Sequence, residues 1–165
     1  MSLEWNLQPT NNDPRSVRLS IPQYVAKANA RFGVVADSTR QTDTPGTYYP
    51  PKYGRHRQLA VRDESPLLPH ARVKRIQEIV GAYLYYARAI DSTMLRAVNK
   101  LGSDQSNPTE AVEDQAEQFL QYAAAHCDAG ITYYASDMKL FGHTDGSYLS
   151  EAKAGSRAGA MFFLG

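Results

Sequence analysis

The chain has 165 residues, and its 18 lysine and arginine residues against 17 aspartate and glutamate residues give a formal net charge of +1 at pH 7. This balance excludes a chain that is strongly basic or acidic throughout, so any electrostatic binding surface must be local. The single cysteine, Cys127, excludes an internal disulfide and a cysteine-rich zinc site, and it fits a reducing compartment. We find no signal peptide and no membrane-length apolar stretch, which predicts an intracellular protein, cytoplasmic or nuclear, without a membrane partner.

The first 33 residues predict a β-hairpin followed by a short helix. Apolar and polar residues alternate in residues 1–7 and 16–21, as they do in half-buried strands, and the intervening PTNNDPR is rich in turn residues. Ser20 and Pro22 then supply a helix start. Apolar residues recur at helical spacing up to Gly33, which supplies a C-terminal stop.

Residues 34–69 show no helical or strand period, so we predict a long linker there. Its basic residues stand among tyrosines, a mixture that suits a phosphate backbone and stacked bases. Further basic residues follow in the next predicted helix. Together the candidate nucleic-acid-binding residues are Lys52, Arg55, Arg57, Arg62, Arg72, Lys74 and Arg75. The alternative is a solvated linker with incidental charge, because Asp63 and Glu64 end the basic run.

Residues 70–130 predict three helices. The first has an apolar face with helical spacing, formed by Val73, Ile76, Val80, Leu84 and Ala87. Gly81 lies within this helix, and we expect another backbone to approach it closely. Asp91 or Ser92 can cap the second helix, which is predicted to end near Gly102.

The third helix has the clearest predicted start. Asn107 can cap it, Pro108 suits the first helical position, and Glu110 completes a capping box. Its apolar face comprises Val112, Ala116, Phe119, Leu120 and Ala123. Glu113, Asp114 and Glu117 lie on another face, and we interpret them as a solvated surface because no histidine stands at ligand spacing.

The last segment, residues 131–165, predicts strands and contains the one isolated carboxylate in a setting that suggests chemistry, Asp145. Strand geometry would place Phe141, His143 and Asp145 on one face, before a bend at Gly-Ser-Tyr and a second apolar run at 158–164. The alternative is that Asp145 begins a turn with the two residues that follow it. The predicted class is therefore α+β: an N-terminal β-hairpin and short helix, a long loop, a three-helix middle and C-terminal strands.

The order of these segments resembles the C-terminal part of a copia-type retrotransposon polyprotein, from the end of the reverse transcriptase into the start of RNase H. The resemblance rests on SVRLSIPQYVAKANARFG, RIQEIVGAYLYYARAIDSTMLRAV, AEQFLQYAA and LFGHTDGSYLSEAKAGSRAGAMFFLG, and it covers nearly the whole chain. It implies four segments: the end of the palm and thumb in residues 1–33, a linker at 34–69, a connection-like helical region at 70–130 and the start of RNase H at 131–165.

The resemblance implies that Asp145 is the first metal-binding, catalytic carboxylate of RNase H, with Mg²⁺ as its cofactor. It also implies core positions for Gly81, Leu84 and Tyr85. The sequence departs from the family at Asp91-Ser92-Thr93, where Arg-Pro-Asp is common, and the other catalytic aspartates would lie outside this chain. We therefore expect a fragment of an RNA-directed DNA polymerase and RNase H without complete catalytic sites, and we predict negligible polymerase or nuclease activity for this chain alone.

Two alternatives belong to other functional classes. The first is a non-catalytic nucleic-acid-binding module that recognises an RNA–DNA hybrid or DNA through the basic residues named above. The second is a protein-interaction domain derived from a retroelement, in which exposed strand edges of an incomplete RNase H-like sheet pair with another chain or with a second copy.

Overall fold

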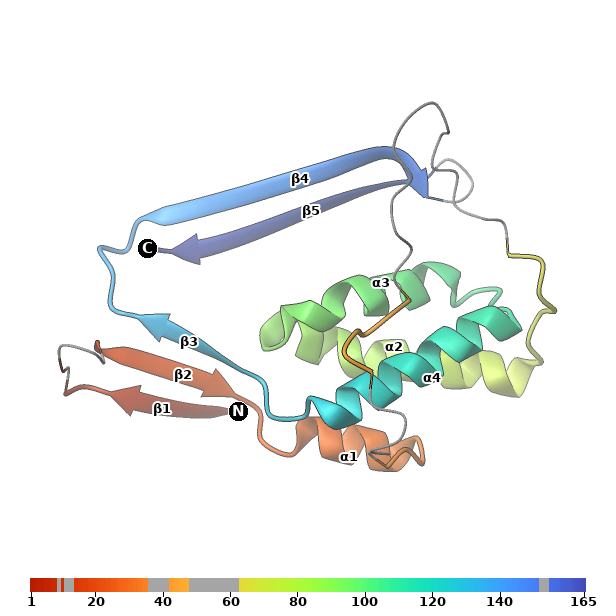
Figure 1. Cartoon of the computed structure of the whole chain (residues 1–165), viewed down its shortest axis with the longest axis horizontal. Coiled ribbons are helices and arrows are strands. Elements are labelled where there is room, and N and C mark those ends of the chain that lie inside the picture. The colour runs from red at the N-terminus through yellow and green to blue at the C-terminus, as the bar shows by residue number, and fades with distance from the viewer. Residues whose placement is uncertain (9, 11–13, 36–41, 48–62, 152–154) are drawn as a thin grey trace.

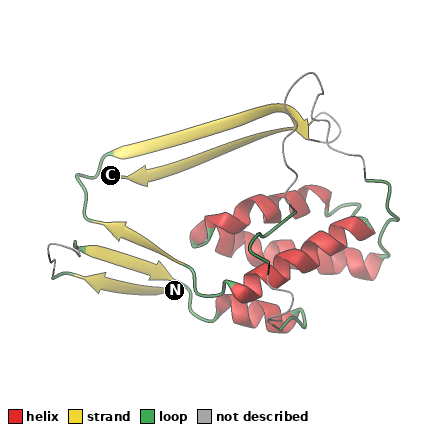
Figure 2. Ribbon diagram, in the orientation of Figure 1, coloured by secondary structure: helices red, strands yellow, loops and turns green. Residues whose placement is uncertain are grey.

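A computed structural model describes residues 1–8, 10, 14–35, 42–47, 63–151 and 155–165, and it confirms a mixed α+β protein (Figures 1 and 2). Strands lie near both ends of the chain and helices lie in the middle. In chain order the elements are β1 (Ser2–Asn6), β2 (Ser16–Ser20), α1 (Tyr24–Arg31), α2 (His70–Ala89), η1 (Ser92–Met94), α3 (Leu95–Asp104), α4 (Glu110–Ala125), β3 (Gly130–Tyr134), β4 (Leu140–Glu151) and β5 (Gly155–Leu164).

The predicted N-terminal hairpin is present, and it gains a third strand from far along the chain. The sheet order is β1-β2-β3, with both pairs antiparallel. β3 therefore pairs with β2 and not with the C-terminal strands. Side chains alternate between the two faces of each strand, and one face of the sheet is apolar. On this face, two rows of side chains run across the three strands. One row consists of Leu3, Leu19 and Ile131, and the other of Trp5, Val17 and Tyr133.

That apolar face is only partly covered. Leu19 packs against the helical core, whereas Trp5, in the outer row, is 64% exposed. The opposite face is polar and includes the facing pair Glu4 and Arg18. Arg18 donates a hydrogen bond from Nη2 to the carbonyl oxygen of Asp128, just before β3 (3.3 Å). A Cβ at Gly130 would lie 2.9 Å from the guanidinium carbon, so a larger residue there would displace the end of the Arg18 side chain.

The hydrophobic core lies among α1, α2, α3 and α4 (Figure 1). The predicted apolar face of the third helix is buried throughout, as are Ile76, Val80 and Ala87 of the first. Two tyrosines of α2, Tyr83 and Tyr86, complete the core. Tyr83 packs edge-on against Phe119 of α4, with ring centroids 4.9 Å apart. Helical periodicity therefore identified most of this core correctly.

Polar groups connect α1 to the same core. The Tyr83 hydroxyl donates a hydrogen bond to Asn29 Oδ1, and both side chains are buried. The Tyr24 hydroxyl donates to the carbonyl oxygen of Ala82 (2.7 Å), while its ring stacks on Tyr86 with centroids 5.5 Å apart. Burial raises the pKa of Tyr83, and the nearby Tyr24 and Tyr86 raise it further. The amphipathic helix α1 is thus fixed to α2 by specific hydrogen bonds as well as by apolar contact.

The start of α4 differs from the prediction. The cap is Thr109, whose Oγ1 accepts a hydrogen bond from the Val112 amide (3.4 Å), so the expected cap at Asn107 and first helical position at Pro108 are wrong. Thr109 in turn donates to the carboxylate of Asp63. Ser65 Oγ accepts from the Ala111 amide (3.2 Å). Asp63 and Ser65, in the segment before α2, thus bind the start of α4, and these tertiary contacts decide where the helix begins.

Other local predictions had mixed outcomes. Gly33 ends the α1 segment with φ of 71°, as expected for a left-handed stop. Asp91 caps the turn η1 by accepting from the Thr93 amide (3.1 Å), also as expected. The N-cap of α1 is Gln23 and not the predicted Ser20 or Pro22, and the Gln23 side chain makes no capping hydrogen bond. α3 ends at Asp104, close to the predicted end near Gly102. The expectations for Gly81 and Tyr85 are wrong: Gly81 is exposed with open space where a Cβ would stand, and Tyr85 is exposed although the resemblance implies a core position.

The C-terminal strands form a separate two-stranded antiparallel sheet. β4 and β5 pack extensively only against each other, and Figure 1 shows the hairpin standing apart from the helices. Every described side chain of β4 is exposed. None of the helices in the described part of the chain has both the length and the apolar character needed to span a bilayer.

Candidate functional site

Asp145 lies in the middle of β4, directly opposite Gly159 of β5. The strand continues through Gly146 and Ser147, which pair with Ala158 and Arg157. The predicted Gly-Ser-Tyr bend is therefore wrong, and so is the alternative that Asp145 begins a turn, because β5 supplies ladder partners past this point. The Gly146 amide donates a hydrogen bond to Asp145 Oδ1 (2.8 Å), which orients an exposed carboxylate on a regular strand.

An aromatic group shares the face that strand alternation assigns to Asp145. The ring of Phe163 stacks on Phe141, with centroids 5.5 Å apart, and on His143, with centroids 5.4 Å apart. Phe141, His143 and Asp145 occupy alternate positions in one unbroken register, which confirms the predicted shared face. The carboxylate therefore stands at the end of a short aromatic row.

Small residues surround Asp145 and leave a shallow hollow on the hairpin. Its lining consists of Thr144, Asp145, Gly146, Ala158, Gly159 and Ala160. Because five of these residues carry a short side chain or none, backbone groups as well as the carboxylate are accessible to a ligand. The hollow offers one acidic group, which can accept hydrogen bonds or provide oxygen ligands.

The described residues do not fit the two-metal centre that the RNase H resemblance implies. Each metal ion of such a centre needs several oxygen ligands. Among the described residues, no three or more His, Cys, Asp or Glu side chains are grouped so that they could hold a metal ion. Asp145 would contribute one carboxylate to a site whose other ligands these residues do not supply, so no metal-dependent step follows from this geometry.

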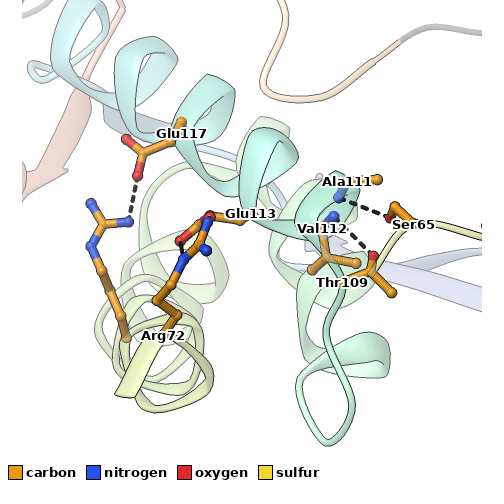
Figure 3. A network of polar contacts seen from close by, with 8 residues as sticks. Ser65, Arg72, Thr109, Ala111, Val112, Glu113 and Glu117 are labelled. Atoms are coloured by element: carbon orange, nitrogen blue, oxygen red, sulfur yellow. Dashed lines mark hydrogen bonds and ion pairs between the residues drawn. The ribbon is translucent and has the colours of Figure 1, made fainter. Parts of the chain in front are cut away.

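Two of the three described candidate nucleic-acid-binding residues are neutralised by ion pairs (Figure 3). Arg72 forms an ion pair with Glu113 of α4, and Arg75 forms one with Glu117. Arg75 Nη2 also donates to the carbonyl oxygen of Phe32 (3.4 Å). These pairs lower the positive potential that a phosphate backbone would meet on this side of α2.

Lys74 is exposed on the same helix. The remaining candidate basic residues, Lys52, Arg55, Arg57 and Arg62, lie outside the described residues. The structure thus brings Arg72 and Arg75 together with two acids, and it separates both from Asp145 on the hairpin.

The role of the acids on α4 differs from the sequence interpretation. Glu113 and Glu117 were expected on a solvated surface, but they join α4 to α2, and the Glu113 side chain is only 17% exposed. The sequence spacing could have predicted these ion pairs. The two arginines are three residues apart and the two glutamates are four apart, so each like-charged pair lies on one face of its helix. Comparison of the chain with known protein families, curated proteins and solved structures found no match.

Proposed function

We propose that this chain is a non-catalytic segment of the reverse transcriptase and RNase H region of a copia-type retroelement polyprotein. The observation that carries the proposal is the position of Asp145 in the middle of the first strand of an antiparallel hairpin whose outer edges are open. The resemblance implies a carboxylate at this place in RNase H. The hairpin also follows the helices in chain order, which is the order that the resemblance implies for the connection and the start of RNase H.

The non-catalytic part of the proposal rests on ligand number. A single carboxylate cannot hold two divalent metal ions, activate water and stabilise the leaving oxygen. The chain alone is expected to leave both strands of an RNA–DNA hybrid intact in the presence of Mg²⁺. Cleavage by the purified chain that disappears with Asp145→Asn would contradict this expectation.

A complementation experiment tests the family assignment. A second polypeptide that carries the later RNase H carboxylates of a copia-type element is mixed with this chain, a labelled RNA–DNA hybrid and Mg²⁺. We expect RNA cleavage with the natural chain, none with Asp145→Asn, and full cleavage with Asp137→Asn, which removes another exposed carboxylate close to β4. Loss of cleavage in both variants, or no cleavage in any mixture, would count against Asp145 as an RNase H ligand.

A second candidate function is protein interaction through the C-terminal hairpin. The specific observation is that large apolar side chains on both faces of β4 and β5 are exposed; Phe162, for example, is 67% exposed. Exposed apolar strands with open edges favour pairing with another chain. Molecular mass measured by sedimentation over a wide concentration range tests this role, and a constant monomer mass would contradict self-association.

A further inference from the structure

The two outer edges of the C-terminal hairpin differ in how well they resist pairing. Natural edge strands avoid association by means of charges, prolines and bulges. β4 contains His143, Asp145 and Glu151, and its register shifts between Ser147 and Glu151. β5 contains one ionisable residue, Arg157, and no proline, and the rest of its sequence is small or apolar. The unprotected edge is therefore that of β5.

The backbone groups on this edge can be identified from the ladder. Lys139 and Gly165 exchange both backbone hydrogen bonds (3.1 and 3.0 Å), so odd-numbered residues of β5 bond to β4 in the constant register that follows. The even-numbered residues consequently direct their N–H and C=O groups to the open edge. In the regular part of the strand these residues are Ala158, Ala160, Phe162 and Leu164.

We propose that β5 pairs antiparallel with β5 of a second copy of this chain, about a two-fold axis at Ala160. This inference rests on the interaction role proposed above and names its partner, edge and register. A two-fold axis at Ala160 places Ala158 opposite Phe162 of the second copy and Gly159 opposite Met161. Phe162 and Met161 thereby each face a small residue.

Neighbouring registers fit less well. An axis at Gly159 would set Ala158 opposite Ala160 and leave the centre of the ladder without packing. An axis at Met161 shortens the ladder and moves Arg157 beyond Leu164. With the axis at Ala160, Arg157 lies opposite Phe163 of the second copy, where a guanidinium and an aromatic ring attract each other. The pairing also converts two isolated hairpins into one four-stranded sheet, and an isolated two-stranded hairpin is marginally stable in water.

Cysteine cross-linking of the full chain tests the register. In a Cys127→Ser background, Ala160→Cys is expected to form a covalent dimer under mild oxidation, because the Cα atoms of a hydrogen-bonded antiparallel pair are about 5.5 Å apart, within disulfide range. Ala158→Cys is the matched control on the same edge. It should not cross-link to itself, but it should cross-link to Phe162→Cys when the two variants are mixed. Far-UV circular dichroism verifies that each variant keeps its helices.

Sedimentation of the uncross-linked chain separates the possible failures. A dimer mass together with the Ala160→Cys cross-link supports the inference. A dimer that cross-links through Gly159→Cys or Met161→Cys instead would overturn the register. A dimer that cross-links at none of these three positions would overturn the β5 edge while leaving the interaction role intact. A monomer mass at every concentration would overturn both.

Discussion

The Tyr83 hydroxyl of α2 donates a hydrogen bond to the side-chain oxygen of Asn29 on α1, and the two groups, separated by 54 residues in sequence, are both buried. Burial, followed by the influence of Tyr24 and Tyr86, raises the pKa of Tyr83. A tyrosine in the unfolded chain has a pKa of about 10, whereas the folded protein keeps Tyr83 neutral to higher pH. Its contribution to stability is therefore complete below pH 10 and decreases as pH rises above that value.

Tyr83→Phe should lower the free energy of unfolding at pH 8 by about 1–3 kcal/mol, because Asn29 would lose a buried hydrogen-bond partner. The variant should also lose less stability between pH 9 and pH 12 than the natural protein. Urea unfolding at each pH measures both effects. Tyr85→Phe, at an exposed position on the same helix, is the control; an equal effect from both variants would contradict this role of Tyr83.

Asp63→Asn should weaken the acid sensitivity of the fold. Hydrogen bonds from the Ser65 hydroxyl, then from Thr109 and from the Ser65 amide, lower the pKa of Asp63. A carboxyl with a depressed folded pKa stabilises the protein above its unfolded pKa of about 3.9, and this contribution is lost as pH falls through the folded value. The melting temperature of Asp63→Asn should therefore decrease less between pH 5 and pH 2. Asp114→Asn, at another exposed acid, should not reproduce the change.

Thr109→Ala should lower the free energy of unfolding by about 0.5–2 kcal/mol, the usual cost of losing a helix cap. Thr109→Ser should retain most of that stability, because the hydroxyl remains. Asn107→Ala should have little effect, since Asn107 is exposed and does not cap α4. Thermal unfolding of the three variants decides between the two caps, and a larger loss at Asn107 than at Thr109 would contradict the structure.

Replacing both Glu113 and Glu117 with Gln should increase the affinity for an RNA–DNA hybrid if the arginines of α2 contact phosphates. The change would release Arg72 and Arg75 from their ion pairs. The salt dependence of binding should steepen by up to about 0.9 per additional phosphate contact. Titrations at several salt concentrations measure the slope. Glu110→Gln, in the first turn of the same helix, is the control, and unchanged binding in the double variant would argue against this helix as a contact surface.

Elements governed by local periodicity were predictable from the sequence. The buried faces of α2 and α4 follow the 3.6-residue period, and the shared face of Phe141 and Asp145 follows the two-residue period of a strand. These patterns depend on neighbours a few positions away. They therefore identify an element and its apolar face without knowledge of the tertiary structure.

Features that depend on distant partners were not predictable. The cap of α4 moved to Thr109 because Asp63, 46 residues away, accepts a hydrogen bond from the Thr109 hydroxyl. The glutamates of α4 are ion-paired because α2 lies alongside. Asp145 stays within a strand because β5 continues the ladder beyond it. In each case the deciding interaction joins two elements, and single-element patterns contain no information about that pairing.

The pairing of β3 with β2 has a consequence for the order of events during synthesis. Ser20 of β2 meets Gly130 of β3, which emerges from the ribosome 110 residues later. At about 5–20 residues per second, β1 and β2 would wait several seconds before their third strand exists. During that interval the apolar row containing Trp5 and Val17 lacks Tyr133 altogether. The nascent N-terminal hairpin therefore keeps the β2 edge open until β3 has been synthesised.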